Sequence, residues 1–148
     1  MTDHITILLV EDNVEQARLT QHVLKRNEVC GDIFIVRDGQ EAMDYLCRKN
    51  RYADEGKSPR PHLVLLDLNL PQIDGKEVLR LMKSDETLKD IPVIIVSASD
   101  REEDVNEVYE IGAAGYISKS KSFESFNHAI AAVHGRVGKH KHRARLPA

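Results

Sequence analysis

The sequence predicts a doubly wound α/β domain, in which a parallel sheet is covered by helices on both faces. Short apolar runs rich in β-branched residues alternate along the chain with segments whose apolar residues have helical spacing. Runs without polar/apolar alternation are typical of parallel strands that are buried on both sides. The 148 residues suit one domain with a sizeable core. We therefore expect five strand–helix repeats joined by right-handed crossovers.

The predicted strands are the apolar runs, of which the last is the weakest. They are residues 7–10, 33–36, 63–66, 93–96 and 116–117. Their β-branched residues favour strands over buried helix segments. A sheet of five parallel strands follows from this count.

The segments between the strands are predicted to be amphipathic helices, because apolar residues recur at i, i+3 and i+4. The first, residues 14–25, is the least regular. The others are marked by Ala42, Tyr45 and Leu46; by Val78, Leu81 and Met82; by Val105, Val108, Tyr109 and Gly112; and by Phe123, Phe126, Ile130 and Val133. Between the second helix and the third strand, residues 51–61 are polar and rich in helix breakers, which predicts a long surface loop.

Charge is distributed unevenly along the chain. Residues 135–148 contain five basic residues and no acid, so this segment carries a net charge of +5. Because the whole chain has a net charge of −3, residues 1–134 carry a net charge of −8. We expect this tail to be flexible and solvated. Its charge alone permits attraction to nucleic acid, and His140 and His142 permit weak metal binding. Direct nucleic-acid binding is not expected, because no aromatic residue lies among the charges to stack on bases.

Composition also sets the expected location. No apolar run approaches the roughly 20 residues of a membrane span. The first residues do not resemble a signal peptide, so a cytoplasmic protein without a membrane partner is expected. Cys30 and Cys47 lack the spacing of a redox or metal motif, and we interpret them as reduced, small apolar residues.

Polar residues follow several of the predicted strands. They are Glu11 and Asp12, Asp67, Ser97 and Lys119. Because the carboxyl ends of parallel strands form one edge, these side chains are predicted to gather there. Crowded carboxylates either rise in pKa or bind a cation, and oxygen ligands favour Mg²⁺. Each residue alone has an ordinary explanation as a helix cap or surface charge, but their joint arrangement favours a functional site.

This pattern resembles the receiver domain of two-component response regulators. The resemblance covers about residues 5–133. It rests on the acidic pair, the sequence DLNLPQIDG at residues 67–75, Ser97 followed by Ala98, and Lys119. It implies a flavodoxin-like fold of strand order 2-1-3-4-5 in a receiver domain of residues 1–134, followed by the basic tail at 135–148.

The resemblance also implies roles for individual residues. Asp67 would accept a phosphoryl group from a sensor histidine kinase. Glu11, Asp12, Asp67 and the backbone carbonyl of Asn69 would hold Mg²⁺. Lys119 would contact a phosphoryl oxygen. The chain would then be a phosphoacceptor signalling protein, which catalyses only its own phosphorylation and dephosphorylation.

Ser97 and Tyr116 match the family's switch residues. On phosphorylation the Ser97 hydroxyl would bond the phosphoryl group, and the Tyr116 ring would turn inward. Signalling would leave through the fourth helix, fifth strand and fifth helix, residues 102–133, where relatives also commonly dimerise. A homodimer is therefore one expectation. Side chains at Asn69 and Ser99 influence water access in relatives.

One position departs from the family pattern. The family usually has proline after the lysine, often in a cis peptide, whereas Ser120 follows Lys119 here. Either the chain absorbs the roughly 2.5–4 kcal/mol of a non-proline cis bond, or the loop is trans. Lys119-Ser120, the long loop and residues 67–71 together resemble stand-alone regulators exemplified by the partners of cyanobacterial phytochromes, which implies a phytochrome-type kinase.

Two alternatives share the predicted fold. A flavodoxin-like cofactor-binding domain would need a phosphate-binding loop after the first strand, where Glu11 and Asp12 repel phosphate. A pseudo-receiver that serves only as an interaction module is disfavoured by the complete set of acids. The residues after about 134 are too few for a DNA-binding or enzymatic output domain, so we expect a single-domain regulator.

Overall fold

The computed structural model describes residues 5–26, 31–54, 56, 58–99 and 101–119 of the chain. Its strands form one parallel sheet of order β2-β1-β3-β4-β5. The strands are β1 (Ile5–Val10), β2 (Gly31–Val36), β3 (Leu63–Leu66), β4 (Val93–Ser97) and β5 (Gly115–Ser118). The predicted fold class and strand order are confirmed.

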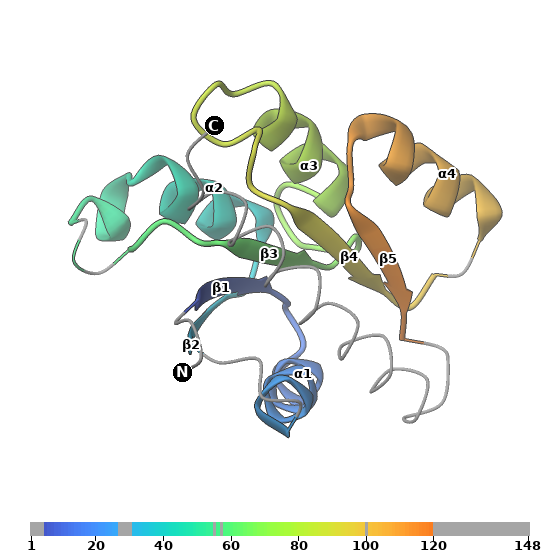
Figure 1. Cartoon of the computed structure of the whole chain (residues 1–148), viewed down its shortest axis with the longest axis horizontal. Coiled ribbons are helices and arrows are strands. Elements are labelled where there is room, and N and C mark those ends of the chain that lie inside the picture. Colours follow the sequence, from blue (N-terminus) through green and yellow to red (C-terminus); the bar gives the residue numbers. More distant parts are fainter. Residues whose placement is uncertain (1–4, 27–30, 55, 57, 100, 120–148) are drawn as a thin grey trace, which may run out of the picture.

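Helices cover both faces of this sheet (Figure 1). The helices are α1 (Val14–Arg26), α2 (Gly39–Cys47), α3 (Gly75–Lys83) and α4 (Glu102–Ile111), with a short 3-10 helix η1 (Asn50–Tyr52) after α2. Helix α1 packs on one face, and α2, α3 and α4 pack on the other. The predicted fifth helix and the basic tail lie outside the described residues. None of the helices in the described ranges is long and apolar enough to span a membrane.

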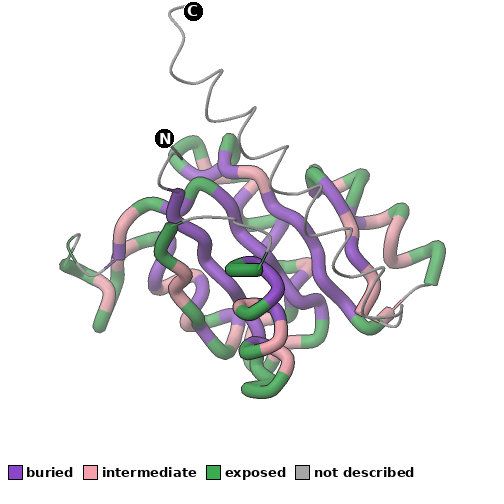
Figure 2. Tube along the Cα trace, turned by 60° about the horizontal axis from the view of Figure 1, so that its bottom comes forward, coloured by how far each residue is buried: buried purple, intermediate pink, exposed green. Residues whose placement is uncertain are grey.

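The sheet separates two apolar clusters. Alternate residues of one strand point to opposite clusters: Leu8 packs with α2 and α3, whereas Ile7 and Leu9 pack with α1. The central strands are therefore buried throughout (Figure 2). The edge strand β2 differs, because most of its residues are exposed or half-buried and Ile35 is 37% exposed.

Helix α3 buries a different set of residues from the one predicted. Leu81 is 38% exposed, whereas Leu79 is fully buried beside Val78 and Met82. The spacing of Leu81 from Val78 is helical, but Leu79 lies nearer the centre of the face that meets the sheet. The prediction for Leu81 is therefore wrong.

The long polar segment before β3 is fastened to α2. The buried Ser58 hydroxyl donates to the carbonyls of Tyr52 (2.8 Å) and Asp54 (3.1 Å). The Tyr45 hydroxyl of α2 donates to the Pro59 carbonyl at 2.8 Å. The predicted surface loop thus includes one 3-10 turn and a buried anchor at Ser58.

Candidate functional site

Two acidic residues extend the sheet by one position at its carboxyl edge. The backbone N–H of Glu11, just after β1, donates to the Val36 carbonyl at 3.0 Å. That of Asp67, just after β3, donates to the Val10 carbonyl at 3.1 Å. These bonds continue the parallel pairing, so both side chains are placed by the sheet rather than by a free loop.

The three predicted metal ligands with side-chain carboxylates lie together. Glu11, Asp12 and Asp67 each offer a carboxylate oxygen, and these oxygens lie within 4.8 Å of one another. Glu11 and Asp67 are only 3% and 6% exposed, whereas Asp12 is exposed. Carboxylate oxygens at this spacing are the donor set of a hard divalent cation. The chemistry of these residues therefore fits a divalent metal ion.

Lys119 provides the positive charge beside these acids. It directly follows β5, and its backbone N–H donates to the Ser97 carbonyl at 2.7 Å. Its ammonium ion-pairs with Glu11 Oε1 and lies 3.3 Å from Asp67 Oδ2. The Lys119 side chain is only 10% exposed, so solvent screens these interactions weakly.

Burial raises the pKa of the Glu11 carboxyl above its ordinary value. The hydrogen bond and the charge of Lys119 act in the opposite direction, and the nearby charge of Asp67 adds to the rise. Lys119 is therefore the main group that favours the ionised form of this buried acid. A second cation at this edge would favour the ionised form further.

The loop after Asp67 is held close to its side chain. The Asn69 N–H donates to Asp67 Oδ1 at 3.2 Å, and the Gly75 N–H donates to the Leu68 carbonyl at 2.9 Å. A Cβ atom on Gly75 would lie 2.1 Å from the Asp67 carbonyl oxygen, so only glycine fits there. The Pro71 carbonyl accepts from the Gly39 N–H at 3.2 Å, which ties the loop to α2.

The two predicted switch residues contact the same segment. Ser97 is fully buried, and its hydroxyl accepts from the Ser99 N–H at 3.2 Å. Tyr116 is half-buried, and its hydroxyl donates to the Ser99 carbonyl. Ser99 therefore lies between them. The Lys119–Ser120 peptide bond lies outside the described residues.

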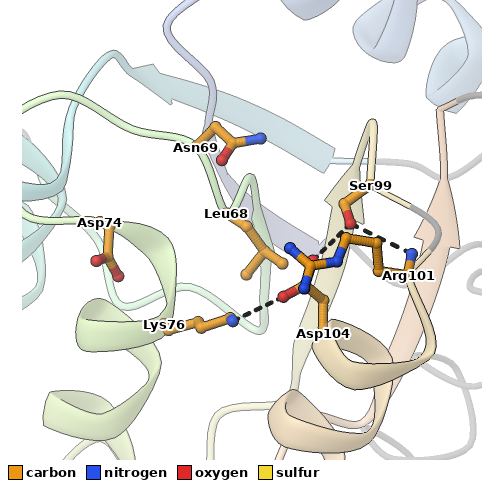
Figure 3. A pocket seen from close by; sticks show the side chains of 7 residues that line it. All are labelled: Leu68, Asn69, Asp74, Lys76, Ser99, Arg101 and Asp104. Carbon is orange, nitrogen blue, oxygen red and sulfur yellow. Dashed lines mark hydrogen bonds and ion pairs between the residues drawn. The ribbon is translucent and has the colours of Figure 1, made fainter.

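A pocket of about 240 Å³ adjoins this edge between the start of α3 and the start of α4 (Figure 3). Asn69, Ser99 and Asp104 are among the residues that line it, and the Lys76 ammonium donates to Asp104 Oδ1 at 2.8 Å across it. The sequence does not predict this pair, because no pattern links two residues 28 positions apart.

Fold and site together define the class of protein. Residues 7–131 match the response regulator receiver domain family, so the chain belongs to that family. Receiver domains of this family interact with histidine kinases in two-component signalling.

Particular relatives are cyanobacterial. The chain is 44% identical to the response regulator Rcp1 of Synechocystis sp. over 118 residues, which cover 80% of this chain and 78% of Rcp1. A crystal structure of the Mn²⁺-bound form of Rcp1 matches 97% of this chain and 99% of that chain, with a TM-score of 0.81 and 38% identity. The phosphorylated cyanobacterial phytochrome response regulator RcpA matches 88% of this chain and 91% of that chain, with a TM-score of 0.79 and 43% identity. The resemblance to this group is confirmed.

Proposed function

We propose that this chain is a single-domain response regulator of a phosphorelay, which accepts a phosphoryl group from a sensor histidine kinase on Asp67. The observation that carries the proposal is the meeting of three carboxylates and the Lys119 ammonium at one edge of the sheet. An isolated buried carboxylate would be costly, whereas a site for a metal ion and a phosphoryl group uses all four side chains.

The reaction transfers the phosphoryl group from nitrogen to oxygen. An Asp67 carboxylate oxygen attacks the phosphorus of a kinase phosphohistidine. The new O–P bond gives an acyl phosphate as the P–N bond breaks, and the electron pair stays on the imidazole nitrogen, which takes up a proton. Asp67 lies at the carboxyl edge of the sheet and is 6% exposed, so the phosphodonor would approach it from that edge. The chain would be a phosphoacceptor signalling protein that catalyses only its own phosphorylation and dephosphorylation.

Four groups of this chain would hold Mg²⁺. They are the carboxylates of Glu11, Asp12 and Asp67 and the backbone carbonyl of Asn69. The bound ion would offset the negative charge that three acids and a phosphoryl group bring together. Support comes from the spacing of the carboxylate oxygens and from the Mn²⁺-bound relative.

Lys119 holds the Asp67 carboxylate before transfer and would contact a phosphoryl oxygen after it. Its 3.3 Å approach to Asp67 Oδ2 supports this role. Ser97 would turn its hydroxyl to the phosphoryl group, and Tyr116 would turn inward in response. Their shared contact with Ser99 supports a coupled movement.

The partner is proposed to be a phytochrome-type histidine kinase in the cytoplasm, supported by the similarity to RcpA.

The receiver domain would span residues 1–134, with residues 135–148 as a basic tail. The output would leave through α4, β5 and the residues that follow to 133, a surface on which two copies would also dimerise. The acids that would meet an incoming phosphate make a flavodoxin-like cofactor site unfavourable without a metal.

The test is phosphorylation by a small phosphodonor such as acetyl phosphate, followed on a phosphate-affinity gel with and without Mg²⁺. Wild type is expected to give a shifted band only with Mg²⁺, and Asp67→Asn is expected to give none. Asp90→Asn, at an exposed position away from the acids, is the matched control and should be labelled like wild type. Equal bands in wild type and Asp67→Asn would remove Asp67 from its role.

A further inference from the structure

Four side chains form a connected cluster between α3 and α4, beside a separate ion pair from Arg80 of α3 to Glu107 at 3.1 Å. The Lys76 ammonium of α3 donates to Asp104 Oδ1 at 2.8 Å and to Glu107 Oε1 at 2.7 Å. Asp104 Oδ2 accepts from the Ser99 hydroxyl at 2.6 Å. We call Lys76, Ser99, Asp104 and Glu107 the α3–α4 latch; Figure 3 shows its Lys76–Asp104 and Ser99–Asp104 contacts.

The latch is more enclosed than an ordinary surface ion pair. The Lys76 and Asp104 side chains are 26% and 16% exposed. In the same helical turn, the Arg101–Glu103 pair is 66% and 80% exposed. Exposed pairs contribute little free energy, whereas Asp104 is bonded on both carboxylate oxygens and partly shielded from water. The two acids therefore provide a natural comparison within one turn of α4.

Ser99 connects the latch to both switch residues. Its N–H donates to the Ser97 hydroxyl, its carbonyl accepts from the Tyr116 hydroxyl, and its own hydroxyl donates to Asp104. The hydroxyl also accepts from the Arg101 N–H at 3.3 Å, so all three polar groups of Ser99 are engaged. A displacement of this residue must break or carry along at least one of these bonds.

We propose that Asp104 is a positioning residue that holds Ser99, and through it Ser97, in the unphosphorylated arrangement and so slows phosphorylation of Asp67. This inference rests on the proposed function of Asp67. When the Ser97 hydroxyl moves to a phosphoryl group, the Ser99 N–H either follows it or loses its partner. Asp104 opposes a movement of Ser99 with the Ser97 hydroxyl, because Asp104 itself is held against α3 by its ion pair with Lys76. A state reached only after breaking the latch is less populated, and phosphorylation through that state is slower.

The main variant is Asp104→Ala, with Glu103→Ala as its matched control. Both remove one acid from the first turn of α4, but only Asp104 contacts Ser99 and Lys76. With acetyl phosphate and Mg²⁺, we expect Asp104→Ala to be phosphorylated about fivefold faster than wild type, a change in the range of one ordinary hydrogen bond. Glu103→Ala should stay within about twofold of wild type.

A second pair separates positioning from general destabilisation. Lys76 contacts Asp104, and Asp104 in turn accepts a hydrogen bond from the Ser99 hydroxyl. Lys76 can therefore influence Ser99 only through Asp104. Lys76→Ala should therefore raise the rate in the same direction as Asp104→Ala, and Lys76→Arg, which keeps a cation for Asp104, should restore the wild-type rate. Loss of packing alone would lower the melting temperature without raising the rate.

The outcomes distinguish the two proposals. If wild type is labelled at Asp67 but Asp104→Ala is labelled no faster than Glu103→Ala, the proposed role of Asp104 is wrong and the proposed function is unaffected. Faster labelling of Asp104→Ala and Lys76→Ala, with rescue by Lys76→Arg, supports the latch. Absence of Asp67-dependent labelling in wild type overturns both.

Discussion

The Lys119 ammonium ion-pairs with the Glu11 carboxylate, although the two residues are 108 positions apart in the chain. The pair joins the ends of β1 and β5, which are not neighbours in the sheet. The same ammonium lies 3.3 Å from Asp67 Oδ2, at the end of β3. One cation therefore balances two buried acids and couples the stability of the fold to the chemistry of the site.

Lys119→Gln should destabilise the fold when divalent cations are absent. The variant leaves Glu11 and Asp67 buried without a counter-charge, and loss of one partner of a buried pair costs about 3 kcal/mol. In urea unfolding with EDTA, we expect a fall of that size in the free energy of unfolding. Mg²⁺ should stabilise Lys119→Gln more than wild type, because the ion meets a larger uncompensated negative charge.

The control for this prediction is Lys89→Gln, which removes an exposed lysine paired with Glu86. Such a pair is worth less than about 1 kcal/mol, and Mg²⁺ should stabilise this variant only as much as wild type. An equal loss of stability in the two variants would mean that Lys119 does not neutralise the buried acids.

Asp12→Asn should weaken Mg²⁺ binding with little effect on stability. Asp12 is exposed, unlike the other two acids of the cluster, so its charge can be removed within about 0.5 kcal/mol of wild-type stability. Loss of one carboxylate should lower Mg²⁺ affinity about tenfold or more, measured by isothermal titration calorimetry. Glu15→Gln, exposed in the first turn of α1, is the control. Equal affinities for the two variants would exclude Asp12 from the metal site.

Gly75→Ala should disturb both the fold and the phosphoacceptor loop. The added Cβ would lie 2.1 Å from the Asp67 carbonyl oxygen and 2.6 Å from Leu68 Cα. Backbone atoms must therefore move, at a cost of about 2 kcal/mol, and labelling of Asp67 should slow. In Gly56→Ala the added Cβ would lie 3.3 Å from a side-chain oxygen of Asp54. This control should be labelled at the wild-type rate. If Gly75→Ala is also labelled at the wild-type rate, the loop after Asp67 tolerates displacement and the prediction is wrong.

Stability should fall with rising pH above about 10 through Tyr45. Burial raises the pKa of this tyrosine from 10.0 to about 12. Between these values the unfolded chain loses the phenolic proton while the folded chain keeps it, so the unfolded state binds fewer protons and stability decreases as pH rises. Below about pH 10, Tyr45 keeps its proton in both the folded and the unfolded chain, so it does not contribute to the pH dependence of stability.

The measurement is urea unfolding at pH 9 and pH 11. Tyr45→Phe cannot ionise at this position, so it should lose less stability between the two conditions than wild type. Tyr109→Phe, at a side chain that is 48% exposed, serves as the control and should fall as steeply as wild type. An identical decrease in all three proteins would show that Tyr45 does not contribute.

The predictable part of the fold is the part that depends on local pattern. Continuous β-branched runs predicted the strands, and the structure extends them by at most a few residues, as at Ile5–Val10 and Val93–Ser97. Helical spacing predicted α3 but not which leucine it buries. Both Leu79 and Leu81 are close to the apolar side, and only contact with the sheet decides that Leu79 is fully buried and Leu81 is 38% exposed.

The candidate site divides in the same way. The fold class could be predicted from the sequence, and so could the common edge at which Glu11, Asp12, Asp67, Ser97 and Lys119 lie. The reason is that the carboxyl end of a parallel strand is a position in the sequence as well as in space. Three relationships could be seen only in the folded chain: which of these side chains are buried, the pairing of Lys119 with Glu11, and the contacts of Asp104 with Lys76 and Ser99. Those relationships depend on how helices pack on the sheet, and the separation of two residues along the chain does not encode that packing.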